Sequence, residues 1–372
     1  MPSVWRFVVF LSIVLTVWTG MHAYVLWRAW PLVTAVAVRR VFLGAAVLLW
    51  LSFPLGRFAA HAGLGRAGRA LETAGSLWIG VLFISLVCLL AADLVTGFGW
   101  LFPRLVPAAR TAAFAAAGLL SCLALVQGLR APVVKAYEVK LAGLPPDLNG
   151  TVVVKLSDMH LGGILGRRWL QDRVAQVEAL HPDVLVITGD LIDGDAGAVE
   201  PLLPELSRFR ARLGVWAVTG NHEFYAGLER CVALMKSAGF KVLRDRSEVV
   251  APGLVFAGVD DLSARRQFKM DGDPVARALQ GRPEGATMFL CHSPLQVQEA
   301  SRLGVGLMLS GHTHDGQIWP FGYVVKLFYP YLVGRYLVGG MTLIVTPGTG
   351  TWGPPMRLFG PGEILRITLR PL

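Results

Sequence analysis

Long apolar runs dominate the first 130 residues of the chain, and four of them are candidate membrane helices. They cover residues 7–27, 41–55, 76–96 and 111–129. The first and third have about the 20 residues that a helix needs to cross the hydrocarbon core of a membrane. Trp27, Trp50, Trp78 and Trp100 lie near the ends of these runs, as the interfacial aromatic belts of membrane proteins do. The pattern predicts an all-α transmembrane region of about four helices over residues 1–135.

Three details of these runs leave alternatives open. The stretch 41–55 spans a membrane only if residues 31–38 contribute, which places Arg39 and Arg40 inside the span. The stretch 7–27 has an alternative as the core of a signal peptide, but it is longer than such cores and further spans follow it. Asp93, near the end of the third run, is expected at the membrane interface, with an intramembrane functional acid as the alternative.

From residue 151 onward, short β-rich runs alternate with amphipathic stretches of helical period. The runs are TVVVKL, DVLVIT, GVWAVT, LVFAGV, ATMFL, GLMLS, TLIVT and EILRITL, and the candidate helices cover residues 167–180, 199–211, 227–238 and 273–280. Strands that alternate with helices predict an α/β domain, and the strand-rich end indicates a mixed sheet or a second sheet. Residues 136–150 include the turn-rich AGLPPDLNG and are predicted to be a linker, so that the domain covers residues 151–372.

Composition and charge agree with a membrane protein. Of the 372 residues, 54% are hydrophobic and only 16% are charged, which is unusual for a soluble enzyme. Residues 1–147 hold twelve Lys and Arg against four acidic residues, so they carry +8 of the formal net charge of +10. This basic excess flanks apolar runs, which indicates membrane-surface charge and gives no reason to expect a nucleic acid. The four cysteines show no disulfide or zinc spacing, which fits a reducing compartment.

The basic residues also predict an orientation. With four spans, the amino terminus, residues 56–75 and residues 130–140 lie on one side of the membrane. That side carries seven Lys and Arg residues, against five on the other. The positive-inside rule then predicts a multi-pass protein of the cell membrane whose domain at residues 151–372 is cytoplasmic.

Polar clusters follow five of the β-rich runs of the second half. They are Ser157-Asp158-Met159-His160, Gly189-Asp190-Leu191-Ile192-Asp193, Gly220-Asn221-His222-Glu223, Cys291-His292-Ser293-Pro294 and Gly311-His312-Thr313-His314. Ligands of open α/β sheets bind at the carboxyl ends of the strands, so we expect the five clusters to converge on one edge. Five of the eight histidines of the chain lie in them, which a chance distribution does not explain.

Imidazole and carboxylate together are the ligands of divalent transition metals. The number of candidate ligands is too large for one tetrahedral ion and fits two ions that share a bridging carboxylate. Such a pair binds phosphoryl oxygens, generates hydroxide from water near neutral pH and stabilises both the attacking and the leaving oxygen. Glycines in the clusters let the backbone turn sharply next to a ligand.

The motifs DMH, GDLID, GNHE, CHSP and GHTH, in this order, resemble those of the calcineurin-like metallophosphoesterases, and the resemblance is closest to their membrane-associated bacterial branch. It covers about residues 150–372 and implies a fold of two packed β-sheets flanked by helices. It implies that one metal is bound by Asp158, His160 and His314, the other by Asn221, His292 and His312, and that Asp190 bridges them. It implies that His222 is not a ligand but a general acid, or a stabiliser of phosphoryl charge.

Further roles follow from this resemblance. Asp193 is expected to be structural or to support a neighbouring site residue, and Glu223 to support a metal ligand. Mn²⁺ is the first candidate for both metals, with Fe, Zn, Ni and Co as alternatives.

Residues 318–340 hold many aromatic and few charged residues. They are either an apolar lip that admits a lipid-linked phosphate or a hairpin that packs on the core.

The leading hypothesis is a membrane-anchored phosphoesterase with two metal ions, in which metal-bound hydroxide attacks a phosphodiester or pyrophosphate bond, with a lipid-linked substrate as one possibility. One alternative is a non-catalytic membrane sensor or transporter-like protein, but the complete ligand set argues against it. Another is a nuclease held at the membrane, which needs a basic groove with stacking aromatics. Residues 264–269, ARRQFK, are the only local candidate for such a groove, and a solvated loop is the simpler interpretation.

Overall fold

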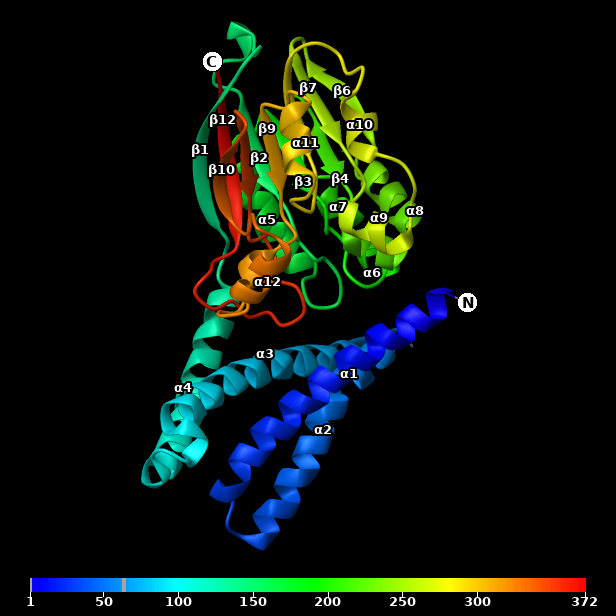
Figure 1. The fold of residues 1–372 in the computed structure, drawn as a ribbon. Coiled ribbons are helices and arrows are strands. Elements are labelled where there is room, and N and C mark those ends of the chain that lie inside the picture. The colour runs from blue at the N-terminus through cyan, green and yellow to red at the C-terminus, as the bar shows by residue number, and fades with distance from the viewer. Residues whose placement is uncertain (1, 62–64) are drawn as a thin grey trace. The chain divides into compact units, whose positions relative to one another are not determined.

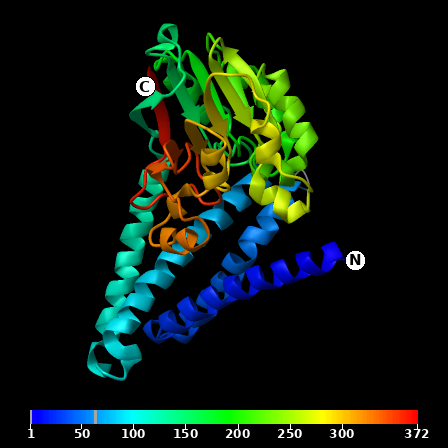
Figure 2. The ribbon, with the colours of Figure 1, turned by 45° about the horizontal axis from the view of Figure 1, so that its top comes forward.

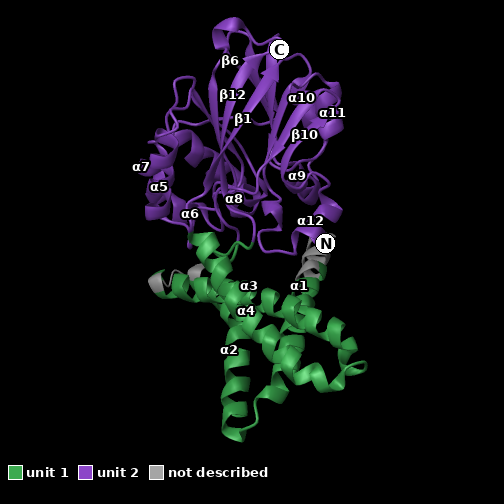
Figure 3. Ribbon diagram, turned by 90° about the vertical axis from the view of Figure 1, so that its left-hand side faces the viewer, with its two compact units in different colours: residues 1–129, 353–358 green, residues 130–352, 359–372 purple. Residues whose placement is uncertain are grey.

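The computed structural model describes residues 2–61 and 65–372 of the chain. The chain divides into two compact units, which Figure 3 shows in separate colours. Unit 1 comprises residues 1–129 together with the short segment 353–358, and unit 2 comprises residues 130–352 and 359–372.

Four long helices form unit 1, as the apolar runs predict. They are α1 (Pro2–Ala29), α2 (Val36–His61), α3 (Gly65–Thr96) and α4 (Val106–Leu129). Among the described residues, three stretches are long and apolar enough to cross a membrane: Val36–Gly56, Ala67–Gly99 and Pro103–Leu129. The first of these begins upstream of residue 41 and includes Arg39 and Arg40, as the short run at 41–55 requires. The expected span 7–27 lies within α1.

A buried polar cluster joins the helices of unit 1. Asp93 of α3, which we expected at the membrane interface, is only 1% exposed. The guanidinium of Arg28 lies 2.7 Å from its carboxylate, and Tyr24 donates a hydrogen bond of 2.6 Å to the same oxygen. Arg110 of α4 lies 3.8 Å from the other oxygen. The carboxylate thus ties α1, α3 and α4 together.

Two six-stranded mixed sheets form the centre of unit 2 (Figure 1). The first holds, in spatial order, β1 (Val133–Leu141), β12 (Glu363–Pro371), β2 (Val152–Leu156), β3 (Val184–Thr188), β4 (Val215–Val218) and β5 (Lys241–Val242). The second holds β10 (Gly334–Val338), β11 (Met341–Val345), β9 (Leu307–Ser310), β8 (Ala286–Leu290), β7 (Leu254–Gly258) and β6 (Arg246–Ala251). Strands β2 to β5 are parallel neighbours, as are β7, β8, β9 and β11.

Both faces of each sheet are covered, which explains the continuous apolar runs in the sequence. Val153 of β2 packs into the core between the two sheets, whereas its neighbour Val154 packs against the helices on the outer face. Helices α5 (Arg167–Glu178) and α8 (Asn221–Ser237) cover the first sheet, and α10 (Pro274–Leu279) and α11 (Val297–Arg302) cover the second. The expected fold of two packed sheets flanked by helices is confirmed.

Two expected segments differ from the structure. The stretch 199–211 holds only α6 (Ala196–Val199), a short 3₁₀ turn and α7 (Leu203–Leu206), because Pro201 and Pro204 prevent a continuous helix. The stretch 136–150, expected to be a linker, contains most of β1. This strand pairs along its whole length with β12, which lies more than 200 residues later in the chain. Its alternating pattern is weak in sequence because β1 is an edge strand with many exposed residues.

Candidate metal centre

The five polar clusters meet at one end of the two sheets, beyond the carboxyl ends of β2, β3, β4, β8 and β9 (Figure 1). The first three strands belong to one sheet and the last two to the other. Convergence follows from parallel pairing, because parallel strands end at the same edge. The site therefore lies where the ends of the two sheets face each other.

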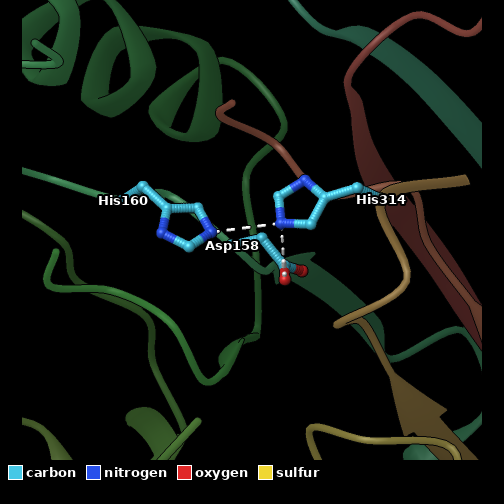
Figure 4. A group of neighbouring side chains, drawn as sticks. All are labelled: Asp158, His160 and His314. Carbon is cyan, nitrogen blue, oxygen red and sulfur yellow. Dashed lines mark hydrogen bonds and ion pairs between the residues drawn. The ribbon is translucent and has the colours of Figure 1, made fainter. Parts of the chain in front are cut away.

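One group of candidate ligands consists of Asp158, His160 and His314 (Figure 4). The Nε2 atoms of the two imidazoles are 3.1 Å apart, and Nε2 of His314 is 3.4 Å from Oδ1 of Asp158. Atoms that bind one divalent transition metal at about 2.1 Å are themselves separated by roughly 3 to 4 Å. These three side chains therefore have the spacing of a metal-binding group.

A second group consists of Asp190, His292 and His312. Nε2 of His292 lies 3.1 Å from Oδ2 of Asp190 and 3.3 Å from Nδ1 of His312. The same Nδ1 atom is 2.9 Å from the side-chain oxygen of Asn221. All four residues predicted for this part of the site, counting Asp190, are thus brought together.

Asp190 lies between the two groups. Its Oδ2 atom is 3.1 Å from His292 of the second group and 3.8 Å from His160 of the first. Asp158 also approaches the second group, because its Oδ1 atom is 3.9 Å from Nε2 of His292. Two carboxylates thus face the same cluster of imidazole nitrogens.

The backbone at these residues is strained. Asp158, His160, Asp190, His312 and His314 all have positive φ, between 46° and 73°. Non-glycine residues rarely adopt this conformation, and it concentrates at functional sites that the surrounding fold holds in place. Glycines permit the close approach of the loops: a Cβ at Gly220 would lie 2.2 Å from Oδ1 of Asp190, and one at Gly311 would lie 2.2 Å from Oδ2 of Asp158.

Hydrogen bonds fix the orientation of the imidazoles of the second group. Nδ1 of His292 is 2.8 Å from the carbonyl oxygen of Thr188, which leaves Nε2 directed at Asp190. Nε2 of His312 is 2.8 Å from the hydroxyl of Tyr329, which leaves Nδ1 directed at His292 and Asn221. Such outer contacts set which nitrogen is available to a metal.

Glu223 holds together two of the loops that carry candidate ligands. Its carboxylate accepts hydrogen bonds from the backbone N–H groups of Asp190, Ile192 and Gly220. Burial and the nearby carboxylate of Asp190 raise the pKa of Glu223 to about 7, although the hydrogen bonds oppose this. The side chain is fully buried, and its carboxylate connects the loops after β3 and β4.

His222 is placed beside both groups. Its Nδ1 atom is 2.8 Å from Oδ1 of Asp193, and its ring lies edge-on to that of His160 at 4.6 Å between centroids. Burial opposes a charge on His222, but Asp190 and the contact with Asp193 outweigh it and raise the pKa of the imidazole to about 9. His160, Asp193 and His222 also have atoms close enough to form a third metal-binding group, which shares His160 with the first.

The electrostatics and one buried oxygen favour a bound cation. Burial raises the pKa of Asp190, but His292 and His222 outweigh this effect and keep that pKa well below its usual value. His314 and His292 likewise hold the pKa of buried Asp158 below its usual value. Among the described residues, Oδ2 of Asp158 is buried without a hydrogen-bond partner. Two ionised carboxylates and several imidazoles in one dry site are chemically suited to divalent metal ions, which would replace protons of the imidazoles.

Comparisons with known proteins identify the family. A family model described as calcineurin-like phosphoesterase matches residues 152–316. A transmembrane protein with metallophosphoesterase domain from Danio rerio is 38% identical over 264 residues, which are 68% of this chain and 60% of that protein. An uncharacterized metallophosphoesterase from Aquifex aeolicus is 35% identical over 246 residues, which are 64% of this chain and 91% of that protein. The chain therefore belongs to the calcineurin-like metallophosphoesterase family, as its motifs predict.

The extent of the match differs between these relatives and a solved structure. The chain spans 60% of the length of the Danio rerio protein and of a protein with the same description from Bos taurus, which is 37% identical. A dimetal phosphatase from Danio rerio is a similar solved structure, at 16% identity and a TM-score of 0.39, and the match covers 59% of this chain and 99% of that one.

Sequence reasoning missed several residues of the site. Tyr329 and Thr188 carry no signal of their own, because their roles depend on where distant imidazoles point. Lys155 is the third. It occupies a position of β2 that faces the core between the sheets, and its amine donates hydrogen bonds of 2.5 Å to the carbonyl oxygen of Ser310 and 3.2 Å to the hydroxyl of Thr346. The lysine within the apolar run TVVVKL could have indicated a buried polar contact, because a charged residue is unusual in a buried strand.

Proposed function

We propose that this chain is a membrane-anchored phosphoesterase that uses two divalent metal ions to hydrolyse a phosphodiester or pyrophosphate bond. The observation that carries the proposal is the position of Asp190 between the two ligand groups, within 3.8 Å of His160 and 3.1 Å of His292. A single tetrahedral ion needs four ligands, whereas seven candidate side chains gather here.

The residues divide into two sets. Asp158, His160 and His314 would hold one ion, Asn221, His292 and His312 would hold the other, and Asp190 would be shared by both. When bound, two such ions supply hydroxide near neutral pH and neutralise charge on the phosphoryl oxygens. Mn²⁺ is our first choice, and Fe, Zn, Ni and Co are alternatives, because imidazole and carboxylate ligands suit all of them.

His222 acts on the leaving oxygen. Its contact with Asp193 fixes the ring through Nδ1 and leaves Nε2 available to donate a proton or a hydrogen bond. Asp193 is therefore a positioning residue for His222, and Glu223 positions the loops of Asp190 and Asn221. These roles agree with the chemistry of phosphoryl transfer, in which the protein mainly positions the reacting groups and stabilises the developing charge.

A lipid-linked phosphate ester is the substrate class that we favour. Three candidate membrane helices and the exposed aromatic side chains at residues 319–328 support it. We also retain the cytoplasmic orientation of unit 2, which rests on the excess of Lys and Arg residues on one side of the predicted spans.

Hydrolysis by the full-length protein in detergent tests the reaction. Bound metal is stripped, Mn²⁺ is added back, and turnover of a chromogenic phosphodiester and of a phosphomonoester is measured. We expect Mn²⁺-dependent turnover that Asp190→Ala lowers by about 10³-fold or more. Asp172→Ala, which changes an exposed carboxylate on α5, is the matched control and should retain full turnover.

His222→Ala tests the division of roles. We expect it to lower turnover by about 10²- to 10⁴-fold while the bound metal is retained. His181→Asn changes an exposed histidine and is its control. Equal loss of metal and turnover in His222→Ala would make His222 a ligand. A full complement of metal without turnover of any phosphate ester, lipid pyrophosphates included, would favour the non-catalytic sensor.

A further inference from the structure

The segment 319–328 keeps its apolar side chains in solvent. It includes α12 (Gly322–Phe328), which has no buried residue. Leu327 is 80% exposed and Phe328 is 72% exposed, and Trp319, Phe321, Tyr323 and Val324 are also exposed, whereas Val325 is partly buried. Soluble domains rarely leave such a group of neighbouring apolar residues uncovered.

The two interpretations of residues 318–340 apply to different parts of that stretch. Tyr331, Tyr336 and Val338 pack against the core of the second sheet, and β10 pairs with β11. These residues therefore form the hairpin that covers the core. The apolar segment 319–328 does not take part in that packing, so its hydrophobic character has another cause.

The apolar segment is attached to the metal centre at both of its ends. After α12, the hydroxyl of Tyr329 contacts His312 at 2.8 Å. Before it, the side chain of Gln317 forms hydrogen bonds with both the backbone N–H and the carbonyl of Trp352, whose ring lies 5.9 Å from that of His222. A surface that binds this segment would therefore also lie close to the metal centre.

Short segments connect unit 1 to unit 2 at two places in the chain. Only three residues separate the end of the candidate span Pro103–Leu129 from the start of β1, and fully extended they reach roughly 10 Å. The loop 353–358 belongs to unit 1, where the N–H of Arg357 donates to the carbonyl of Ala124 in α4. Trp352, beside His222, directly precedes this loop in sequence.

A second exposed apolar pair supports the same surface. Phe268, the last residue of α9 (Leu262–Phe268), and Met270, just after it, are exposed, with basic Arg266 and Lys269 beside them in sequence. In Figure 2, as in Figure 1, α9 and α12 lie at the same end of the sheets. Aromatic residues mixed with a few basic ones are typical of surfaces that enter the headgroup region of a bilayer.

We propose that the apolar segment 319–328 docks on the headgroup region of the membrane that holds the helices of unit 1. The occupant of this surface is a lipid bilayer. Lys326, the only charged residue of α12, can keep its amine in water while its stem follows the apolar face. If the proposed function is correct, the metal centre receives phosphate esters of lipids from the bilayer surface.

Fluorescent labels test this contact without reference to activity. Leu327→Cys is placed in a Cys88→Ser, Cys122→Ser background, because Cys231 and Cys291 are buried. The protein is reconstituted in vesicles of phosphatidylcholine and phosphatidylglycerol, and an environment-sensitive dye is attached. Leu372→Cys is the matched control, since Leu372 is 84% exposed and Figure 1 places the carboxyl terminus at the opposite end of the sheets from α12.

We expect spin-labelled lipids with shallow acyl nitroxides to quench the dye at residue 327 and not at residue 372, and iodide to do the reverse. Equal quenching of both sites by iodide would overturn the proposal. Protection of residue 327 from iodide without quenching by lipid would also overturn it, because a protein, such as a second copy of this chain, would then cover the segment.

A kinetic comparison tests the consequence for the substrate. Leu327→Ser with Phe328→Ser should lower turnover of a bilayer-embedded phosphate ester by about tenfold, since interfacial contact is lost. Turnover of a water-soluble diester should stay within about twofold, because neither residue belongs to the metal centre. Lipid quenching without any hydrolysis would leave the docking surface standing and refute only the proposed function. An equal loss on both substrates would refute the link between docking and substrate access.

Discussion

Both units of this protein bury an aspartate among polar partners, but they balance its charge differently. In unit 1, Asp93 faces Arg28 at 2.7 Å and accepts a hydrogen bond from Tyr24, so the chain itself supplies the opposite charge. In unit 2, Asp158 and Asp190 face imidazoles and each other, and one oxygen of Asp158 lacks a hydrogen-bond partner among the described residues. The first cluster pairs its carboxylate with cations of the chain itself, whereas the second has a carboxylate oxygen that an added cation can bind.

The comparison shows how similar residue types serve stability or chemistry. A buried arginine that pairs with a carboxylate fixes the helices around it but leaves no site for a ligand. Imidazole is neutral for much of the physiological range and can offer a lone pair to a metal. Five candidate ligand residues have positive φ, whereas Asp93, Arg28, Tyr24 and Arg110 all lie within regular helices.

The largest effect on stability is expected at the Asp93 cluster of unit 1. Asp93→Asn leaves the buried guanidinium of Arg28 without its counter-charge, and breaking a buried ion pair from one side costs about 3–5 kcal/mol. Thermal unfolding in detergent should show a strongly lowered transition for unit 1. Asp93→Leu combined with Arg28→Met should recover most of the loss, and an unchanged transition in Asp93→Asn would show that the pair is not needed.

Removal of metal should have the next largest effect, and it should affect unit 2. A ligand present at 100 to 1,000 times its dissociation constant stabilises the folded state by about 2.7 to 4.1 kcal/mol. A chelator should therefore lower the unfolding temperature of unit 2 and leave that of unit 1 unchanged. Asp190→Ala should abolish the response to the chelator. A wild-type protein that unfolds identically with and without chelator would contradict a metal centre.

A smaller effect is expected from Tyr329→Phe. The change removes the hydroxyl that orients His312, and such outer contacts typically contribute about 10- to 100-fold to metal affinity. Titration of stripped protein with Mn²⁺ should show weaker binding of one ion. Tyr331→Phe is the matched control, because that hydroxyl contacts Gln298 and not a ligand. Equal affinities in the two variants would mean that the fold alone orients His312.

The smallest effect concerns Lys155 and depends on pH. Burial lowers the pKa of its amine to about 7, despite the nearby carboxylates of Asp158 and Glu363, from an ordinary value of 10.5. Between these two pH values the unfolded chain binds the additional proton, so the free energy of unfolding contributed by Lys155 rises with pH, by at most about 1.4 kcal/mol per pH unit.

Lys155→Met should remove this dependence. In metal-stripped protein, the unfolding temperature of the wild type relative to the variant should rise between pH 7 and pH 9, by at most about 4 °C per unit. Below pH 7 the difference should be constant, because both states are then protonated. A constant difference across the whole range would mean that the amine stays charged in the folded protein.

The sequence predicted the regular part of the architecture well. All eight β-rich runs from TVVVKL to EILRITL form strands, because each is buried and apolar over most of its length. Strands β1, β5, β6 and β10 were missed, since they are short or largely exposed and their pairing depends on distant partners. The helix expected at 199–211 is not continuous, because Pro201 and Pro204 interrupt it.

The sequence by itself determined which residues could meet. The five polar clusters each follow an apolar run, and parallel strands bring their carboxyl ends to one edge, so a shared site was predictable from local pattern and order. The choice of seven candidate ligands within the clusters came from the resemblance to the family. Motif resemblance then supplied the family, because the spacing of several chemical groups is far more specific than any one of them.

Only the tertiary structure decided how those residues are oriented and what surrounds them. Which nitrogen of His312 faces the site depends on Tyr329, and the partner of His222 is Asp193 because the loops after β3 and β4 lie side by side. The exposure of Leu327 and the partial burial of Tyr336 against the core could not be distinguished in sequence, since both side chains are largely apolar and close together in the chain. Hydrogen-bond direction and burial arise from contacts between distant segments, and local sequence does not encode those contacts.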